Sequence, residues 1–156
     1  MYNTLLILAR DIIFYKKIGL PDTFETRLYL MFFYFSIILI NYKMKNLKFS
    51  QKTYDHFFNN IEYNLRESGL GDITVNKKMK EFNKIFYDIL IKLNLHEIKT
   101  LKFEINDKLI FKYFPILKDN KSTNYKAFRG YFKIFFDFCF EQSPDNMINN
   151  LNKFKY

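Results

Sequence analysis

The fold is decided by one apolar stretch of the sequence, Leu28-Tyr-Leu-Met-Phe-Phe-Tyr-Phe-Ser-Ile-Ile-Leu-Ile40. Its apolar side chains would cover the whole circumference of a helix, a pattern typical of a helix that is enclosed by others. The uncharged stretch continues only to Tyr42 and so has 15 residues, whereas a membrane-spanning helix needs about 20 mainly apolar residues. The sequence therefore predicts a buried core helix that ends near Lys45, and no membrane span.

Glycine and proline mark the limits of the helix that precedes this stretch. Gly19 and Pro21 follow a segment that we predict to be helical from Tyr2 to Lys17. Glycine favours the left-handed conformation that ends many helices, and proline cannot continue a helix. Asp22 is then the expected N-cap of the core helix, with Glu25 three residues later as in a capping box.

The spacing of apolar residues predicts two further helices before residue 94. Ser50 is the candidate N-cap of the first of them, and Gly69 ends it. Its apolar stripe comprises Tyr54, Phe57, Phe58, Ile61 and Leu65. The second has the most regular pattern in the chain, with spacing 4-3-4-3-4 over Val75, Met79, Phe82, Phe86, Ile89 and Leu93. Such a seam suits the antiparallel packing of helices.

The pattern after residue 94 leaves one choice open. Residues 99–113 fit a short helix, although Leu101-Lys-Phe-Glu-Ile105 alternates as a strand does. Ser122 is the candidate cap of a following helix rich in phenylalanine. Ser143 is the candidate cap of a last helix, because Pro144 suits the first helical turn.

Length and composition predict an all-α, single-domain helical bundle of about six or seven helices over residues 1–156. The single cysteine, Cys139, excludes an internal disulfide and a cysteine-rich zinc site. Arg10 and Asp11 interrupt the apolar N-terminal segment, so we expect no signal peptide. The net charge of +9 would attract nucleic acid or an anionic membrane surface.

Motifs of catalysis and metal binding are not recognisable in the sequence. His56 and His96 lie 40 residues apart, and no metal-binding spacing surrounds either of them. Gly69-Leu70-Gly71-Asp72 lacks the third glycine and the Lys-Ser/Thr pair of a phosphate-binding loop. No Gly-x-Ser-x-Gly motif and no paired carboxylates can be identified. We therefore expect no enzyme, metal, cofactor or small-molecule substrate.

Basic residues gather on the predicted helix around the Val75–Leu93 seam. Lysine exceeds arginine by 21 to 4 in this chain, so a cluster of lysines is open to two interpretations. It is either a solvated helix face or a surface for an anionic lipid, ribosomal RNA or an acidic protein segment. The candidate partner-binding residues are Lys77, Lys78, Lys80, Lys84 and Tyr87.

The few arginines lie close to the predicted turns. An arginine retained in a lysine-rich chain suggests that its planar, bidentate guanidinium group is needed. We therefore expect Arg10, Arg27 and Arg66 to form buried ion pairs with Asp22, Glu67 or Asp72, which would fix how the turns pack. The residues expected to hold these turns are Arg10, Pro21, Asp22, Arg27, Arg66, Glu67, Gly69, Gly71 and Asp72.

The same segments resemble the ubiquinol–cytochrome c chaperone family. The N-terminal part of the resemblance consists of Ala9-Arg10, Phe14-Tyr15, Gly19-Leu20-Pro21-Asp22-Thr23 and Arg27. The second part consists of Phe58, Glu62, Leu65-Arg66-Glu67 and Gly69-Leu70-Gly71-Asp72, and it continues through Val75, Lys77, Lys78, Lys80, Phe86 and Tyr87. The resemblance is strongest over residues 2–90. The chain departs from the family pattern at Tyr34, where histidine is common.

The resemblance implies a chaperone or assembly factor for ubiquinol–cytochrome c reductase, the cytochrome bc complex. Its expected partners are cytochrome b, which it would bind and hold during assembly, or other subunits of the complex, together with a second assembly factor. Contact with the ribosome or peripheral contact with the membrane is also implied. No transit peptide precedes Tyr2, so we expect a bacterial member in the cytoplasm or peripherally on the inner membrane.

A basic nucleic-acid-binding or ribosome-associated helical module is the alternative function. Such a module would show a steep dependence of binding on salt, because each neutralised phosphate releases counterions. A small enzyme of unrecognised type would need a pocket of converging polar groups, which sequence alone does not reveal.

Overall fold

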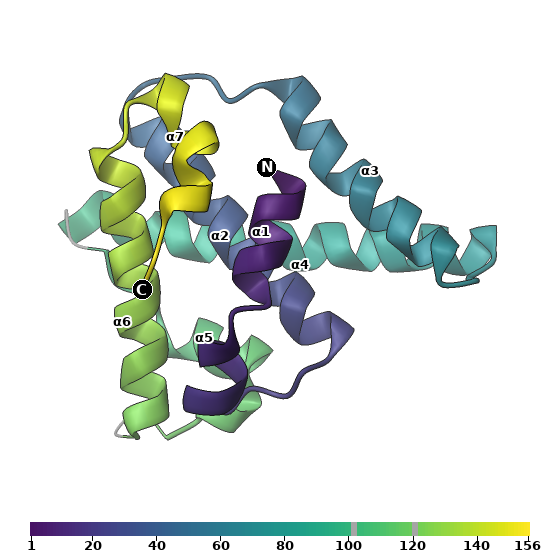
Figure 1. Cartoon of the computed structure of the whole chain (residues 1–156), viewed down its shortest axis with the longest axis horizontal. Coiled ribbons are helices and arrows are strands. Elements are labelled where there is room, and N and C mark those ends of the chain that lie inside the picture. Colours follow the sequence, from purple (N-terminus) through teal and green to yellow (C-terminus); the bar gives the residue numbers. More distant parts are fainter. Residues whose placement is uncertain (101–102, 120–121) are drawn as a thin grey trace.

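The computed structural model of the chain describes residues 1–100, 103–119 and 122–156 (Figure 1). Within these residues the protein is built from helices, and no strand occurs, which confirms the all-α prediction. The α-helices are α1 (Tyr2–Ala9), α2 (Phe24–Met44), α3 (Gln51–Glu67), α4 (Asp72–Thr100), α5 (Asp107–Tyr113), α6 (Thr123–Glu141) and α7 (Pro144–Asn150). Short turns of other helix types are η1 (Ile13–Lys17), η2 (Pro115–Leu117) and η3 (Leu151–Lys153).

Helix α2 is the centre of the bundle, as its composition predicts. It packs against α1, α4 and α6, and Figure 1 shows α4 crossing behind it with α6 at its side. In the described part of the chain α2 is the one helix long and apolar enough to span a membrane, but 72% of its apolar window is buried inside the molecule. This burial identifies α2 as a core helix.

Helix α2 is apolar on every side because other helices surround it, as the contacts of its four consecutive aromatic residues, 32–35, show. Phe32 contacts Phe86 on α4, with ring centroids 5.5 Å apart. Phe33 contacts Phe132 on α6, also at 5.5 Å. Successive residues of a helix point about 100° apart, so Phe32 and Phe33 face different neighbouring helices. The run therefore joins the two halves of the bundle through one helix.

The helix starts depend on single hydroxyl side chains. The side chain of Ser50 accepts a hydrogen bond from the backbone amide of Thr53, and that of Ser122 does so from Tyr125, which confirms both predicted caps. The prediction that Asp22 caps α2 is wrong. Thr23 has the extended backbone of an N-cap, and its Oγ1 accepts from the amide of Thr26 at 3.1 Å. Ser143 precedes α7 without a side-chain cap bond.

The predicted helix from Tyr2 to Lys17 is interrupted. Helix α1 ends at Ala9, and a π-helical turn begins at Ile13. The Asp11 carboxylate accepts a hydrogen bond from the Ile13 amide at 3.0 Å, and the Tyr15 hydroxyl donates to the Ala9 carbonyl at 2.5 Å. These side chains satisfy backbone groups that a continuous helix would have paired internally.

Helix α4 carries the predicted seam on its buried side. The buried members are Val75, Phe82, Phe86, Ile89 and Leu93, while Met79 is half-buried. The open choice over residues 99–113 is resolved in part, because α4 continues to Thr100 and α5 begins at Asp107. Residues 103–106 are non-helical, and residues 101–102 lie outside the described chain.

Two glycines form the turns that the sequence predicts. Gly19 has φ +80° and Gly69 has φ +85°, backbone conformations that other residues rarely adopt. After α3, the amide of Gly69 donates to the carbonyl of Arg66, and the amide of Leu70 donates to that of Leu65. This pair of bonds is a Schellman motif, which ends the helix and turns the chain toward α4.

Candidate functional site

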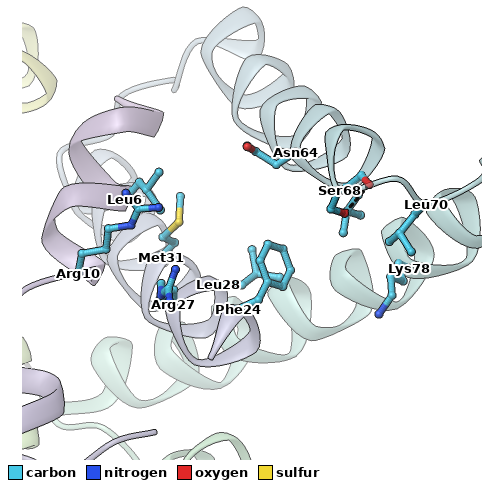
Figure 2. Close-up of a pocket in the computed structure, with 11 residues that line it drawn as sticks. Leu6, Arg10, Phe24, Arg27, Leu28, Met31, Asn64, Ser68, Leu70 and Lys78 are labelled. Carbon is cyan, nitrogen blue, oxygen red and sulfur yellow. Dashed lines mark hydrogen bonds between the residues drawn. The ribbon is translucent and has the colours of Figure 1, made fainter. Parts of the chain in front are cut away.

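The start of α2, which follows the first glycine-containing turn, and the second glycine-containing turn both line one groove. The groove has a volume of about 400 Å³ and is formed by α1, α2, α3, the connection after α3, and α4. Figure 2 shows Leu6 of α1 and Arg10, which directly follows α1, on one side and Ser68, Leu70 and Lys78 on the other, with residues of α2 between them. Segments that are far apart in the sequence therefore build a single surface depression.

The lining of the groove is mostly apolar. Its apolar residues are Leu6, Phe24, Leu28, Met31, Leu65 and Leu70. Leu28, Met31 and Leu65 are buried and belong to the core, whereas Phe24 is 42% exposed. The Phe24 ring also lies 6.2 Å from the ring of Phe82 on α4. Phe24 thus offers an aromatic face to the groove from a position fixed by the core.

Three cationic side chains stand around this apolar lining: Arg10, Arg27 and Lys78. Arg27 pairs with Asp22, with 2.7 Å between Nε and Oδ1, so its charge is partly neutralised within the turn. Lys78 lies 5.9 Å from the centroid of the Phe82 ring. Neither Arg10 nor Lys78 has an ion pair with any residue that the structure describes. The groove therefore combines apolar walls with two positive charges left for a partner.

The other polar residues of the rim are Asn64 of α3 and Ser68, which directly follows α3. Asn64 donates a hydrogen bond to the hydroxyl of Tyr2 at 2.9 Å and so ties α3 to α1. The hydroxyl of Ser68 donates to the carbonyl of Leu65 at 2.7 Å. Both side chains hold the frame of the groove.

The predicted burial of the arginine pairs is wrong. Arg66 donates through Nε and Nη2 to Glu62 and through Nη1 alone to Asp72. The expected pair with a turn carboxylate therefore exists, but the contact with that carboxylate is not bidentate. However, the Arg66 side chain is 41% exposed and that of Asp72 is 80% exposed. Water screens such pairs, so they add little stability. The second expected acceptor, Glu67, lies beside the hydroxyl of Tyr63 and raises the pKa of that group by hydrogen bonding.

The predicted partner-binding residues divide into two groups. Lys78 lines the groove, whereas Lys77, Lys80 and Lys84 are exposed on the opposite side of α4. Tyr87 shares that exposed side, and its hydroxyl accepts a hydrogen bond from the hydroxyl of Tyr54 at 3.1 Å. The five residues therefore do not form one surface.

Reactive side chains in the described part of the chain do not converge on this groove. No cluster of three or more His, Cys, Asp or Glu side chains suited to a metal occurs in that part. Burial raises the pKa of the Cys139 thiol well above its usual range, so the thiol stays protonated. His56 is exposed on α3, and the side chain of His96 lies outside the described residues.

A comparison with protein-family models matches residues 16–98 to the model described as ubiquinol–cytochrome C chaperone. The match covers more than half of the 156 residues. The chain belongs to the ubiquinol–cytochrome c chaperone family. All residues that line the groove except Leu6 and Arg10 fall within the family match. Comparisons with curated proteins and with solved structures gave no significant match.

Membership of the ubiquinol–cytochrome c chaperone family supports a role in assembling the cytochrome bc complex. It also indicates a non-enzymatic function. The groove is the site where both family signatures contribute side chains, through Arg27 at the first turn and Leu70 at the second. Residues of both segments that carry the resemblance thus line one groove.

Sequence reasoning missed several residues of the groove: Leu6, Phe24, Met31, Asn64 and Ser68. Leu6 and Met31 look like ordinary core residues, because apolar periodicity does not separate a groove wall from an interior. Ser68 looks like part of a turn. Phe24 could have been recognised as a candidate for an exposed binding residue, because it is a large aromatic residue directly after a helix cap.

Proposed function

We propose that this protein is a holding chaperone for cytochrome b, and that it contacts a segment of that subunit through the groove between α1, α2, α3 and α4. The observation that carries the proposal is the convergence of both family signatures on one apolar groove with cationic residues at its rim. An amphipathic helix in an apolar groove is a common mode of recognition between a protein and a segment of its partner.

The proposed mechanism is equilibrium binding. A newly made membrane subunit exposes apolar helices whose burial is strongly favourable, at about 25 cal/mol per Å² of apolar surface. The half-exposed ring of Phe24 and the side chain of Leu70 offer such surface at the mouth of the groove. The client would remain bound until another subunit of the complex competes for the same face.

The rim of the groove favours a client segment with an acidic residue. Arg10 is exposed and has no ion pair among the described residues, so a carboxylate of the client could pair with it. Lys78 offers a second positive charge on the opposite wall (Figure 2). Charge complementarity of this kind sets orientation and specificity more than it sets affinity.

The test is complementation of a strain that lacks the gene. Deletion should lower the amount of assembled cytochrome bc complex, measured by its haem spectrum and by native gel, while the messenger for cytochrome b stays unchanged. Wild type should restore the complex, and Arg10→Glu should restore much less of it. Lys126→Glu is the matched control, because Lys126 is also exposed and without an ion pair among the described residues.

A photo-reactive residue in place of Leu70 adds a direct readout. It should cross-link to cytochrome b in cells, whereas the same residue in place of the exposed Asn59 on α3 should not. Normal levels of the complex in the deletion strain would refute the family function for this chain. A cross-link from Asn59 as strong as that from Leu70 would refute the groove as the client site.

A further inference from the structure

Helix α4 exposes a second stripe that mirrors its buried seam. The stripe consists of Ile73, Lys77, Lys80, Lys84, Tyr87 and Ile91, with the spacing 4-3-4-3-4 that the seam also has. Each member precedes a seam residue by two positions, so the stripe lies on the side of α4 away from the core. Ile73 is 88% exposed and Ile91 is 53% exposed. The surface of one helix thus presents aliphatic side chains at both ends of a row of lysines.

The stripe is positively charged in its folded surroundings. Lys77, Lys80 and Lys84 are exposed and have no ion pair with a described residue. The nearby carboxylate of Asp88 is already held by Lys92 at 2.6 Å and by Lys112 at 2.8 Å. Glu81 is the remaining acidic neighbour on this part of α4. The row of lysines therefore keeps most of its charge for a partner.

We propose that this stripe docks the protein on a bilayer surface that contains anionic phospholipid. Ile73 and Ile91 are separated by 18 residues, about 27 Å along the helix, so they would enter the headgroup region at two separate points. The lysines between them would contact lipid phosphates. Tyr87 is half exposed and amphipathic, and such rings favour the boundary between headgroups and acyl chains.

The exposed isoleucines distinguish a membrane from a nucleic acid as the partner. A phosphate backbone would be recognised by the lysines but gains nothing from an aliphatic side chain that is 88% exposed. A bilayer surface uses both kinds of residue. The stripe and the groove lie on different sides of α4, because Lys78 faces the groove and Lys77 does not. The inference is therefore independent of the proposed client.

The test is co-flotation of the full chain with lipid vesicles. The protein should bind vesicles of phosphatidylcholine mixed with phosphatidylglycerol, and should not bind phosphatidylcholine alone. The variant Lys77→Glu/Lys80→Glu/Lys84→Glu should lower the partition coefficient on the order of a hundredfold or more, since each basic residue near an anionic surface contributes. The control Lys108→Glu/Lys118→Glu/Lys126→Glu changes the net charge by the same amount at exposed positions outside the stripe, and it should retain most of the binding.

A second variant tests the aliphatic contribution at unchanged net charge. Ile73→Ser/Ile91→Ser should reduce the partition coefficient on the order of tenfold, with an unchanged circular-dichroism spectrum. If the two triple-glutamate variants lost vesicle binding equally, the binding would depend only on net charge, and the proposal would be overturned. Normal vesicle binding by the serine variant, together with displacement of the protein from vesicles by single-stranded RNA, would assign the stripe to nucleic acid instead.

Discussion

The hydroxyl of Tyr34 donates a hydrogen bond to the hydroxyl of Tyr131 at 2.7 Å, although the two residues are 97 positions apart. Both side chains are fully buried, and Tyr34 also packs edge-on against Phe135 with ring centroids 4.7 Å apart. Tyr34 lies within the residues matched to the family and Tyr131 lies outside them. The last third of the chain therefore completes the core around the family-matched helices.

Removal of one hydroxyl of this pair should destabilise the protein. Tyr34→Phe leaves a buried polar group of Tyr131 without its partner, which costs about 1–2 kcal/mol. Tyr34→Phe/Tyr131→Phe should cost less than the sum of the two single changes, because no hydroxyl is then left unpaired. Urea unfolding of the four proteins measures the coupling. Strictly additive losses would show that the bond contributes nothing specific.

The carboxylate of Asp88 connects α4 to α5 and predicts a dependence of stability on pH. It accepts hydrogen bonds from Lys112 at 2.8 Å and from Tyr113 at 2.5 Å, in addition to its contact with Lys92. Partial burial raises the pKa of the Asp88 carboxyl, but the bonds from Lys112, Lys92 and Tyr113 outweigh burial and lower it to about 2. The ionised form is thus favoured in the folded state.

Asp88→Asn should therefore destabilise the protein at neutral pH and have less effect in acid. Because the folded pKa is below the unfolded value of about 4, the stabilisation is complete above about pH 5 and is lost as the pH falls toward 2. We expect a loss of about 1 kcal/mol near neutral pH, since the half-exposed lysines are screened by water. Urea unfolding at about pH 7 and about pH 3 should show the difference shrinking. A difference that is constant over this range would contradict the ion-pair origin.

The turn after α3 offers a matched pair of glycine substitutions. Gly69→Ala forces a side chain into the left-handed conformation at φ +85° and should cost about 1–2 kcal/mol. Gly71→Ala, two residues later, should be nearly neutral, because Gly71 has no positive φ and its added Cβ meets no atom within 4 Å. Thermal unfolding compares them directly. Equal effects of the two changes would mean that the conformation of Gly69 is unimportant.

Because Arg66 is exposed, its substitution should have only a small effect on the stability of the protein. Arg66→Lys keeps the charge near Glu62 and Asp72 but loses the planar contact with both. Since water screens these pairs, the melting temperature should fall only slightly, by an amount similar to that for Lys80→Arg. Differential scanning calorimetry of both variants measures this. A large loss confined to Arg66→Lys would restore the interpretation of a desolvated pair.

Local patterns in the sequence predicted much of the fold. The seam from Val75 to Leu93 and the caps Ser50 and Ser122 follow from spacing and from backbone hydrogen bonding within a few residues. The break after Ala9 was not predicted, because apolar residues resume at Ile12 and the hydrogen bond from the Ile13 amide to Asp11 is a property of the folded turn. Whether Thr23 or Asp22 caps α2 depends on the conformation of the turn, which places the Thr23 hydroxyl beside the backbone amide of Thr26.

The groove could be predicted only in part. The segments that carry the family resemblance are visible in the sequence, but the arrangement of Arg10, Ser68 and Lys78 around one groove is a result of how α1, α2, α3 and α4 pack together. The burial of an ion pair is likewise a tertiary property, and this is why the prediction for Arg66 failed. The division of the lysines between two sides of α4 was available from helical periodicity.

Residues that are translated last pack against a helix that is translated first, as the contact between η3 and α1 shows. The ring of Phe154 lies 5.0 Å from that of Phe135, next to the face of α2 that holds Tyr34. About 80 residues separate the end of α2 from the start of α6, so translation takes roughly 5–15 s to supply the missing cover. During synthesis the side of α2 that later faces α6 thus lacks its cover, and it is the same kind of aromatic surface that we propose the protein covers on another newly made chain.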